Sequence, residues 1–309
     1  ISLSGVGLHT GRHVNITFKP APADTGLVFV RDDIDGDNLI NAHIKYISNT
    51  DRGTNLDNGL FRIHTSEHVL AAITGLDIDN CFICLDGPEV PIMDGSSKFF
   101  INALEQAKIV EQNVLREEFF PSEPISYLCE DTGSKISILP DDNYRVNTLV
   151  DYKTRVLGEQ EASINHISEF KKEISSARTF SFLHELETLL ENGLIKGGDL
   201  NNAIVYVDKP LAESNMEILK KAFNKESISV TPNGILDNLD LHFPNEAARH
   251  KLLDVIGDLA LIGMKIRGKV IAEKPGHSIN AKFAEKISEV IKSDRKNTLP
   301  KIDFSKNPL

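Results

Sequence analysis

The sequence predicts an α+β fold of two similar halves, each with helices packed on a mostly antiparallel sheet, and an active site between them. The 309 residues exceed one typical domain. Strand and helix patterns occur in the same order in both halves. Ala72-Ile-Thr-Gly-Leu-Asp-Ile78 also matches Ala260-Leu-Ile-Gly-Met-Lys-Ile266, and each segment ends a helix and leads into a strand. The expected units are a first domain at 1–116, a second at 125–292, and a linker or tail at 293–309.

The first half begins with strand patterns. Alternation over His13–Phe18 and a second apolar run over Leu27–Arg31 predict a hairpin. Thr65 or Ser66 as N-cap and Gly75 as stop predict a helix, and a strand over Cys81–Leu85 follows. A second helix is predicted from Ser97 to Lys108. Its expected inward residues are Phe99, Phe100, Ala103 and Leu104. Residues 116–124 contain two prolines and three acids, which indicates the domain boundary.

The second half repeats this pattern. Lys135–Leu139 and Val146–Val150 predict another hairpin, and Val270–Ala272 predicts a later strand. Helices are expected over Asn245–Met264 and Ile279–Ile291. The polar tail contains two prolines and fits a linker into a further domain.

An insert around 181–207 interrupts the second half. A helical pattern over Ser181–Asn192 is followed by the apolar run Ala203–Val207, which predicts a βαβ-like element. The leucines of this helix lie at helical spacing: Leu183, Leu186, Leu189 and Leu190. Such a stripe either closes a small core or lines an apolar channel, and the spacing alone favours the core.

Composition limits the function classes. With 40% hydrophobic and 26% charged residues, the chain is an ordinary globular protein. Its net charge of −11 argues against broad contact with nucleic acid or an anionic membrane, so an anionic substrate needs a local cationic cluster. The longest apolar stretch, Leu252–Met264, is too short to span a bilayer, so no stable membrane insertion is expected. Three cysteines suit a reducing compartment, and the cytoplasm is expected.

The helix near residue 250 carries the clearest chemical signal. His250, Asp254 and Asp258 follow one another at intervals of four, so they share one face of an otherwise apolar helix. Burying ionised carboxylates is costly unless they are paired, hydrogen-bonded or bound to metal. His250 and Asp254 therefore suit a shared cation, although this spacing is common in helices without a metal.

Two further motifs leave alternatives open, and two others predict only structural roles. Glu67 and His68 diverge by roughly 100° on a helix and can serve a metal and its water, or be a first-turn acid and a surface histidine. The turn at Lys274-Pro-Gly either presents His277 to a cleft or is a solvated loop. Cys81 and Cys84 lie three apart in a strand, so their thiols point to opposite faces and indicate structural cysteines. Gly5-Val-Gly-Leu-His-Thr-Gly11 lacks a dinucleotide-binding frame and predicts a turn.

Together these segments resemble the UDP-3-O-acyl-N-acetylglucosamine deacetylases of lipid A synthesis in Gram-negative bacteria, over nearly the whole chain. The motifs that carry the resemblance are Gly5–Gly11, Ser66-Glu-His68, Pro91-Ile-Met-Asp-Gly-Ser96, Ala177-Arg-Thr-Phe180, Gly197-Gly198, Arg249-His-Lys-Leu-Leu-Asp254 with Ile256-Gly-Asp-Leu259, and Lys274-Pro-Gly-His277. The resemblance implies two similar α+β halves and a zinc-dependent hydrolase that releases acetate from a UDP-linked, 3-O-acylated N-acetylglucosamine.

The resemblance also implies a metal site. His68, His250 and Asp254 correspond to the ligands of one catalytic Zn²⁺, with a fourth position left for water. Such an ion lowers the pKa of water from about 15.7 to about 7. Glu67 then corresponds to the general base, and Thr179 to a donor that helps stabilise the oxyanion.

By the same resemblance, His277 is the cationic partner that stabilises developing charge and can protonate the leaving amine. Asp258 holds the ring of His277 protonated and oriented. Whether Glu67 alone transfers both protons is left open.

The implied substrate contacts are more dispersed. Lys251 and Lys274 supply positive charge for the nucleotide sugar, and Asp151-Tyr152 lies near the uridine. Further contacts, several of them along an acyl channel, are Phe180, Gly198, Leu183, Leu186, Leu200 and Val205. The loop Thr50–Asn58 is more polar than an acyl path suggests.

Two further hypotheses concern a fused domain and a different function. Some family members are fused to a β-hydroxyacyl-carrier-protein dehydratase, and the tail fits such a linker. A catalytically silent domain that binds a nucleotide sugar or a lipid, or a scaffold for a missing domain, is the rival function. The presence of Glu67, His277 and all three candidate ligands argues against it, because a binding module needs neither an acid nor a base.

Overall fold

The computed structural model describes residues 1–185, 200, 202–209, 217, 219–221, 225–237 and 239–298. Leu186, Gly197, Gly198 and most of the helix predicted over Ser181–Asn192 lie outside these described residues.

The first half is built on a five-stranded sheet with the order β1-β2-β8-β3-β4. Its strands are β1 (Ser2–Val6), β2 (His13–Pro20), β3 (Leu27–Arg31), β4 (Leu39–Asn41) and β8 (Cys81–Leu85). The alternation of β2 places Val14, Ile16 and Phe18 in the core, as the period of two predicts.

The predicted hairpin of β2 and β3 is wrong. β8 lies between these strands, antiparallel to β2 and parallel to β3. Four of the five β8 residues are buried, and such a strand stabilises the sheet most with a neighbour on either side. The alternation along β2 and the apolar run of β3 identify each strand but not its neighbour.

The second half repeats this arrangement with the order β10-β11-β17-β12-β13. Its strands are β10 (Ile125–Cys129), β11 (Ser134–Leu139), β12 (Tyr144–Asp151), β13 (Glu159–Ile164) and β17 (Gly268–Glu273). The predicted hairpin of β11 and β12 fails for the same reason, because β17 separates them. Each sheet has a single parallel pair, so the prediction of two similar, mostly antiparallel halves is confirmed.

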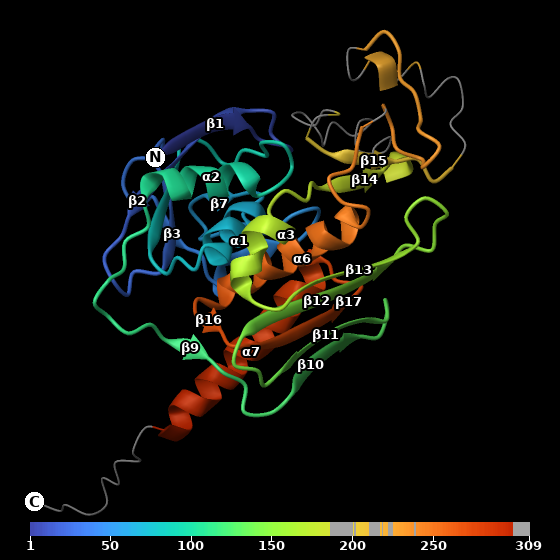
Figure 1. Cartoon of the computed structure of the whole chain (residues 1–309). Coiled ribbons are helices and arrows are strands. Elements are labelled where there is room, and N and C mark those ends of the chain that lie inside the picture. Colours follow the sequence, from blue (N-terminus) through green and yellow to red (C-terminus); the bar gives the residue numbers. More distant parts are fainter. Residues whose placement is uncertain are drawn as a thin grey trace, which may run out of the picture.

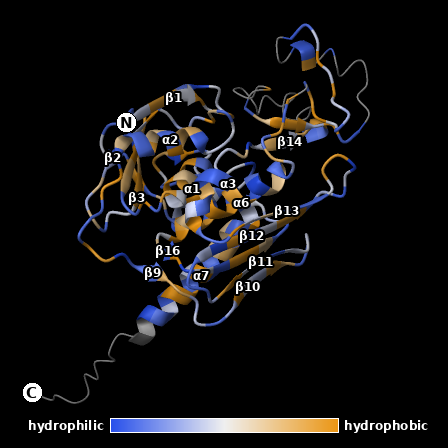
Figure 2. Ribbon diagram, viewed as in Figure 1, coloured by the Kyte–Doolittle hydropathy of each residue, from blue (hydrophilic) through white to orange (hydrophobic). Residues whose placement is uncertain are grey.

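Helices occupy the space between the two sheets (Figure 1). They are α1 (Glu67–Gly75), α2 (Lys98–Ala107), α3 (Phe170–Glu173), α6 (Glu246–Leu259) and α7 (His277–Thr298). Hydrophobic colour is prominent on α1 and α6 and on nearby strands in Figure 2, and one buried cluster includes residues from both halves. In α2, Phe99 is 40% exposed, so its predicted inward position is wrong, whereas Phe100, Ala103 and Leu104 are buried.

The helix ends differ from the sequence pattern. α6 stops at Leu259 and continues as the 3₁₀ turn η3 (Ala260–Ile262), so the predicted helix end at Met264 is wrong. α7 begins two residues before the prediction and extends to Thr298. Its first residue is therefore His277. Among the described residues, no helix combines the length and apolar character needed to cross a membrane.

Short elements complete the fold. They are η1 (Ile44–Tyr46), β5 (Ile47–Asn49), β6 (Asn55–Asp57), β7 (Arg62–Ile63), β9 (Glu118–Phe119), η2 (Ile167–Glu169), β14 (Phe180–Phe182), β15 (Ile204–Tyr206) and β16 (Lys265–Ile266). β14 and β15 pair in parallel, as a βαβ-like insert requires. β9 falls within the expected boundary at 116–124 and pairs with β16, which ties this segment to the second half.

The two halves meet where α1 crosses α6. A Cβ atom at Gly257 of α6 would lie 2.1 Å from the carbonyl oxygen of Glu67 on α1. Only glycine allows the backbones to approach this closely. The close approach sets Glu67 and His68 of the first half beside the polar face of α6.

Candidate metal centre

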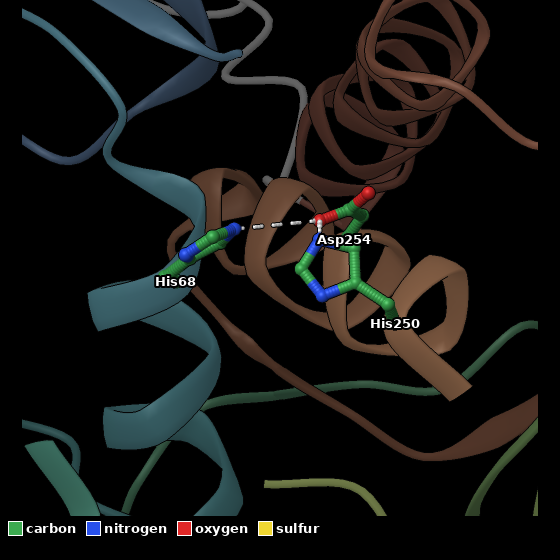
Figure 3. Close-up of side chains that lie close together, drawn as sticks. All are labelled: His68, His250 and Asp254. Atoms are coloured by element: carbon green, nitrogen blue, oxygen red, sulfur yellow. Dashed lines mark ion pairs between the residues drawn. The ribbon is translucent and has the colours of Figure 1, made fainter. Parts of the chain in front are cut away.

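Three buried side chains converge between the halves. His68 projects from α1, and His250 and Asp254 project from α6 toward it (Figure 3). The Oδ1 atom of Asp254 lies 4.0 Å from Nε2 of His68 and 3.4 Å from Nε2 of His250. One donor atom from each residue fits within a span of 4.8 Å.

The protonation states of this cluster suit a metal ion. Burial, reinforced by His250, lowers the pKa of His68 to about 3, and burial also lowers the pKa of His250. Nδ1 of His250 donates to the carbonyl oxygen of Ala177 at 3.1 Å, which leaves Nε2 as a lone-pair donor toward the cluster. Oδ1 of Asp254 is buried and accepts no hydrogen bond from the described residues. Two neutral imidazoles and a carboxylate oxygen without a partner form a donor set for a divalent cation such as zinc.

Lys251 pairs with the second carboxylate oxygen of Asp254. Its Nζ is 2.7 Å from Asp254 Oδ2 and 5.5 Å from the centre of the Phe180 ring. Burial by itself raises the pKa of Asp254, but Lys251 and the nearby histidines outweigh it and hold the pKa below its usual range. The carboxylate therefore stays ionised, and Lys251 brings the local positive charge predicted for an anionic substrate.

Glu67 lies on the next face of α1, and its side chain is buried. The backbone N–H of Thr54 donates to Oε2 of Glu67 at 2.9 Å, and Oε1 lies 3.9 Å from Nε2 of His277. Burial raises the pKa of Glu67 to about 7, although the nearby His277 opposes this shift. A carboxylate with this pKa can exchange a proton at neutral pH.

His277 is held by the second carboxylate of α6. Its Nδ1 lies 2.9 Å from Oδ2 of Asp258, which also accepts a hydrogen bond from Asn280 at 2.8 Å. Burial lowers the pKa of His277, but Asp258 and Asp254 outweigh burial and raise it to about 9. The ring is thus a cation at neutral pH, and it faces Glu67.

The other predicted contacts are distributed around this centre. The rings of Phe180 and His250 have centroids 6.3 Å apart, and Tyr152 packs edge-on against Phe180 with centroids 5.6 Å apart. Nζ of Lys274 lies 3.8 Å from Oδ2 of Asp151. Thr179 is held through its backbone, whose N–H donates to the carbonyl oxygen of Gly95 at 2.8 Å.

The described residues of the insert form a small cluster of their own. Leu183, Leu200 and Val205 are buried together with Leu219, Ile228 and Leu236. Leu183 is the one leucine of the predicted stripe among the described residues, and its packing matches the first alternative, a small core. An acyl channel along these residues stays a prediction. Leu186 and Gly198, the other two residues assigned to substrate contacts in this region, are not among the described residues.

Three residues that no sequence motif singled out contact the site or its supports. Thr54 and Asn280 both donate to Asp258. Glu89 is fully buried and accepts hydrogen bonds from the backbone N–H of His9 at 2.9 Å and from the hydroxyl of Thr65 at 3.1 Å. Glu89 thereby fastens the Gly5–Gly11 turn to the residues before α1. The polar character of the loop Thr50–Asn58 was the only signal for Thr54.

A separate groove lies away from this centre. It has a volume of about 1470 Å³ and is lined by Phe18, Leu104, Val110, Leu115 and Tyr144 together with other residues. None of the candidate ligands, Glu67 or His277 lines it. The groove is therefore distinct from the candidate centre.

The fold and the centre define a class of protein: a hydrolase with a candidate metal site of two histidines and one aspartate, beside a buried carboxylate and a cationic histidine. A family model described as UDP-3-O-acyl N-acetylglycosamine deacetylase matches residues 1–226 and 213–289. The chain belongs to this family of enzymes, which hydrolyse an amide.

Named relatives agree with the family. The chain is 38% identical over 288 residues to UDP-3-O-acyl-N-acetylglucosamine deacetylase of Myxococcus xanthus, covering 93% of this chain and 83% of the relative. It is 45% identical over 292 residues to bifunctional enzyme LpxC/FabZ of Chlorobaculum tepidum, covering 94% of this chain and 62% of the relative. For the corresponding bifunctional enzyme of Bacteroides thetaiotaomicron the identity is 42%, with 63% of the relative covered. The chain thus spans less than two thirds of these bifunctional relatives.

Proposed function

We propose that the chain hydrolyses the N-acetyl group of UDP-3-O-(3-hydroxyacyl)-N-acetylglucosamine and releases acetate, the committed step of lipid A biosynthesis. The observation that carries this proposal is the convergence of His68, His250 and Asp254 beside Glu67 and His277. Amide hydrolysis needs an activated water, a base and an acid, and this cluster offers side chains for each. Family membership and the deacetylase names of the relatives support the choice of substrate.

We further propose zinc as the metal. His68 and His250 through Nε2, and Asp254 through Oδ1, would hold the ion, because these atoms converge and Asp254 Oδ1 is buried without a hydrogen-bond partner among the described residues. When bound, the ion supplies Lewis-acid chemistry that lowers the pKa of water and polarises the amide carbonyl.

Glu67 is the proposed general base. It takes the proton of the water as the water oxygen attacks the acetamide carbon, so one O–H bond breaks and one C–O bond forms. Its pKa of about 7 supports this role, because a carboxylate of that basicity accepts a proton readily and passes it on. The Thr54 amide holds Oε2, which leaves Oε1 toward His277 and the reacting groups.

His277 is the proposed electrostatic partner and acid. As the protonated ring it stabilises the negative charge that develops on the carbonyl oxygen, and it can donate its proton to the amine nitrogen as the C–N bond breaks. Asp258 keeps the charge on the ring and fixes its orientation through Nδ1. The proton that Glu67 took from the water then passes to His277, whose Nε2 lies 3.9 Å from Oε1, so both groups return to their starting states as acetic acid, which ionises to acetate, and the free amine leave.

The remaining proposals concern contacts to the substrate. Phe180 and Lys251 border the metal cluster, so they suit contacts to the sugar and its charged substituent. Thr179 precedes Phe180 and suits the second oxyanion donor. Lys274, beside Asp151, suits the nucleotide. Leu183, Leu200 and Val205 are the apolar residues proposed to contact the acyl chain.

Two broader proposals accompany the activity. The names and lengths of the bifunctional relatives support a native polypeptide that continues into a β-hydroxyacyl-carrier-protein dehydratase domain. The free cysteines Cys81, Cys84 and Cys129 support a reducing, cytoplasmic location.

The deciding experiment measures acetate release from a UDP-3-O-acyl-N-acetylglucosamine substrate by the purified chain. The assay is run before chelation, after chelation, and after zinc is added back. Activity that disappears on chelation and returns with zinc is the expected result. A folded, zinc-loaded chain that binds substrate but releases no acetate would instead support the catalytically silent binding function.

A further inference from the structure

Every polar group of Thr54 forms a hydrogen bond within the candidate site. Its backbone N–H donates to Glu67 Oε2 at 2.9 Å, and its hydroxyl donates to Asp258 Oδ1 at 2.5 Å. Its carbonyl oxygen accepts hydrogen bonds from the backbone N–H of Ser66 at 3.1 Å and from the Ser66 hydroxyl at 2.8 Å. The whole residue is 1% exposed. One loop residue therefore contacts α1 and α6 at the points where the two proton-transfer groups are anchored.

The direction of the hydroxyl bond follows from chemistry. An ionised carboxylate only accepts hydrogen bonds, so Thr54 is the donor to Asp258. The other oxygen of Asp258 accepts from His277 Nδ1 and from Asn280. With a donor on each oxygen, the carboxylate cannot rotate without breaking a buried, charge-assisted bond. The plane of the His277 ring is fixed in turn, because its Nδ1 is hydrogen-bonded to Oδ2 of Asp258.

The neighbouring residues favour the same arrangement. A Cβ atom at Gly53 would lie 3.0 Å from Oε1 of Glu67, so any side chain at residue 53 would press on the carboxylate and force it to shift. Ser66 occupies the predicted N-cap position of α1, but its hydroxyl donates to Thr54 instead of capping the helix. The hydrogen bond that would cap α1 is thus replaced by one that holds the loop.

We infer that Thr54 is a positioning residue of the deacetylation reaction: its amide orients the base Glu67, and its hydroxyl orients His277 through Asp258. This inference rests on the proposed function, because the two groups it aligns are the proposed base and acid. A side chain that only filled the loop would need neither the hydroxyl nor its donor geometry. Threonine also suits the role better than serine, because its branched Cβ restricts rotation about χ1.

The test compares Thr54→Val, which keeps the shape and removes the donor, with Thr54→Ser, which keeps the donor. Thr54→Val is expected to lower kcat by about 10- to 100-fold, the usual effect of losing a partner that orients a site residue, with KM little changed. Thr54→Ser is expected to recover most of that loss. Zinc content should stay at the wild-type level, because the contacts of Thr54 lead to Glu67, Asp258 and His277.

Thr148→Val is a matched control. Thr148 is also buried, and its hydroxyl donates to the backbone carbonyl of Ala248 at 3.1 Å. Its loss should lower thermal stability without the specific loss of kcat. If Thr54→Val keeps the wild-type kcat, or if Thr54→Ser loses as much as Thr54→Val, the hydroxyl has no positioning role.

A second readout does not depend on turnover. In protein labelled with ¹⁵N-histidine, the ring signals of His277, assigned with His277→Gln, report the hydrogen bond from Nδ1 to Asp258. Thr54→Val should shift these signals and Thr148→Val should not. An unshifted ring in folded Thr54→Val overturns the inference whatever its activity. If the wild-type chain releases no acetate, the proposed function fails, and the ring signals still decide whether Thr54 orients His277.

Discussion

Nε2 of His277 lies 3.9 Å from Oε1 of Glu67, while Nδ1 of the same ring is bonded to Asp258. The first residue of α7 thus faces the first residue of α1 across the contact between the halves. Each group stabilises the ionised form of the other, because His277 lowers the pKa of Glu67 and Glu67 raises that of His277. Between about pH 7 and about pH 9 the site therefore holds an ionised carboxylate and a protonated imidazole together.

Replacement of Glu67 by glutamine should separate catalysis from metal binding. Glu67→Gln keeps an oxygen for the Thr54 amide but cannot accept a proton from water. We expect kcat to fall by about 10²- to 10⁴-fold, the range for loss of a general acid–base group, with zinc stoichiometry unchanged. Steady-state kinetics and metal analysis of the same preparation measure both. Turnover near the wild-type level would exclude Glu67 as the base.

The rate should depend on pH through this pair. Protonation of Glu67 below its pKa of about 7 removes the base, and deprotonation of His277 above its pKa of about 9 removes the acid, so kcat/KM should be bell-shaped. A bound cation stabilises the ionised form of Glu67 and the neutral form of His277. Both limbs of the pH profile therefore move to lower pH when the metal is bound. Asp258→Asn removes a charge that raises the pKa of His277, so the basic limb should move to lower pH. A basic limb that stays in place in Asp258→Asn contradicts the assignment to His277.

Asp254→Ala should weaken metal binding itself. Loss of a partner outside the ligand set costs about 10- to 100-fold in metal affinity, so loss of a ligand should cost at least about 100-fold. The variant also leaves Lys251 without the carboxylate that lies 2.7 Å from its Nζ, which adds a buried positive charge beside the two histidines. Competition with a zinc-sensitive chelator measures the affinity, and Glu67→Gln serves as the matched variant with an intact ligand set. Affinity equal to that of Glu67→Gln would remove Asp254 from the ligands.

The sequence predicts where strands and helices occur better than it predicts which of them lie side by side. Apolar patterning identifies β2, β3, β11 and β12, but in each half the strand between the predicted pair comes from much later in the chain. Periodicity reports which face of a strand is apolar, and sheet order depends on which faces pack together across long separations. Phe99 shows the same limit for a helix, because an apolar residue at the edge of the stripe is exposed when nothing covers it.

The candidate site could also be predicted only in part. His250, Asp254 and Asp258 share one helix face, so spacing alone groups them, and the structure brings His68 to the same point. Thr54 and Asn280 belong to no motif. Thr54 meets Asp258 across 204 positions of sequence, a contact that depends on how the halves dock. Their roles require the assembled structure.

Gly257→Ala should disrupt the contact between the halves. In most exposed helix positions, replacing glycine by alanine stabilises the helix by up to about 1 kcal/mol. Here the new Cβ would lie 2.1 Å from the backbone oxygen of Glu67, and a backbone atom in a packed helix cannot move aside as a flexible side chain can. We expect destabilisation of about 1–3 kcal/mol, the usual cost of overpacking, and a joint loss of zinc affinity and kcat as α1 moves from α6. Chemical unfolding, zinc titration and kinetics on one preparation measure these effects. A variant as stable and active as the wild type would show that the halves tolerate a wider spacing, and that the close approach at Gly257 does not align Glu67 and His68 with α6.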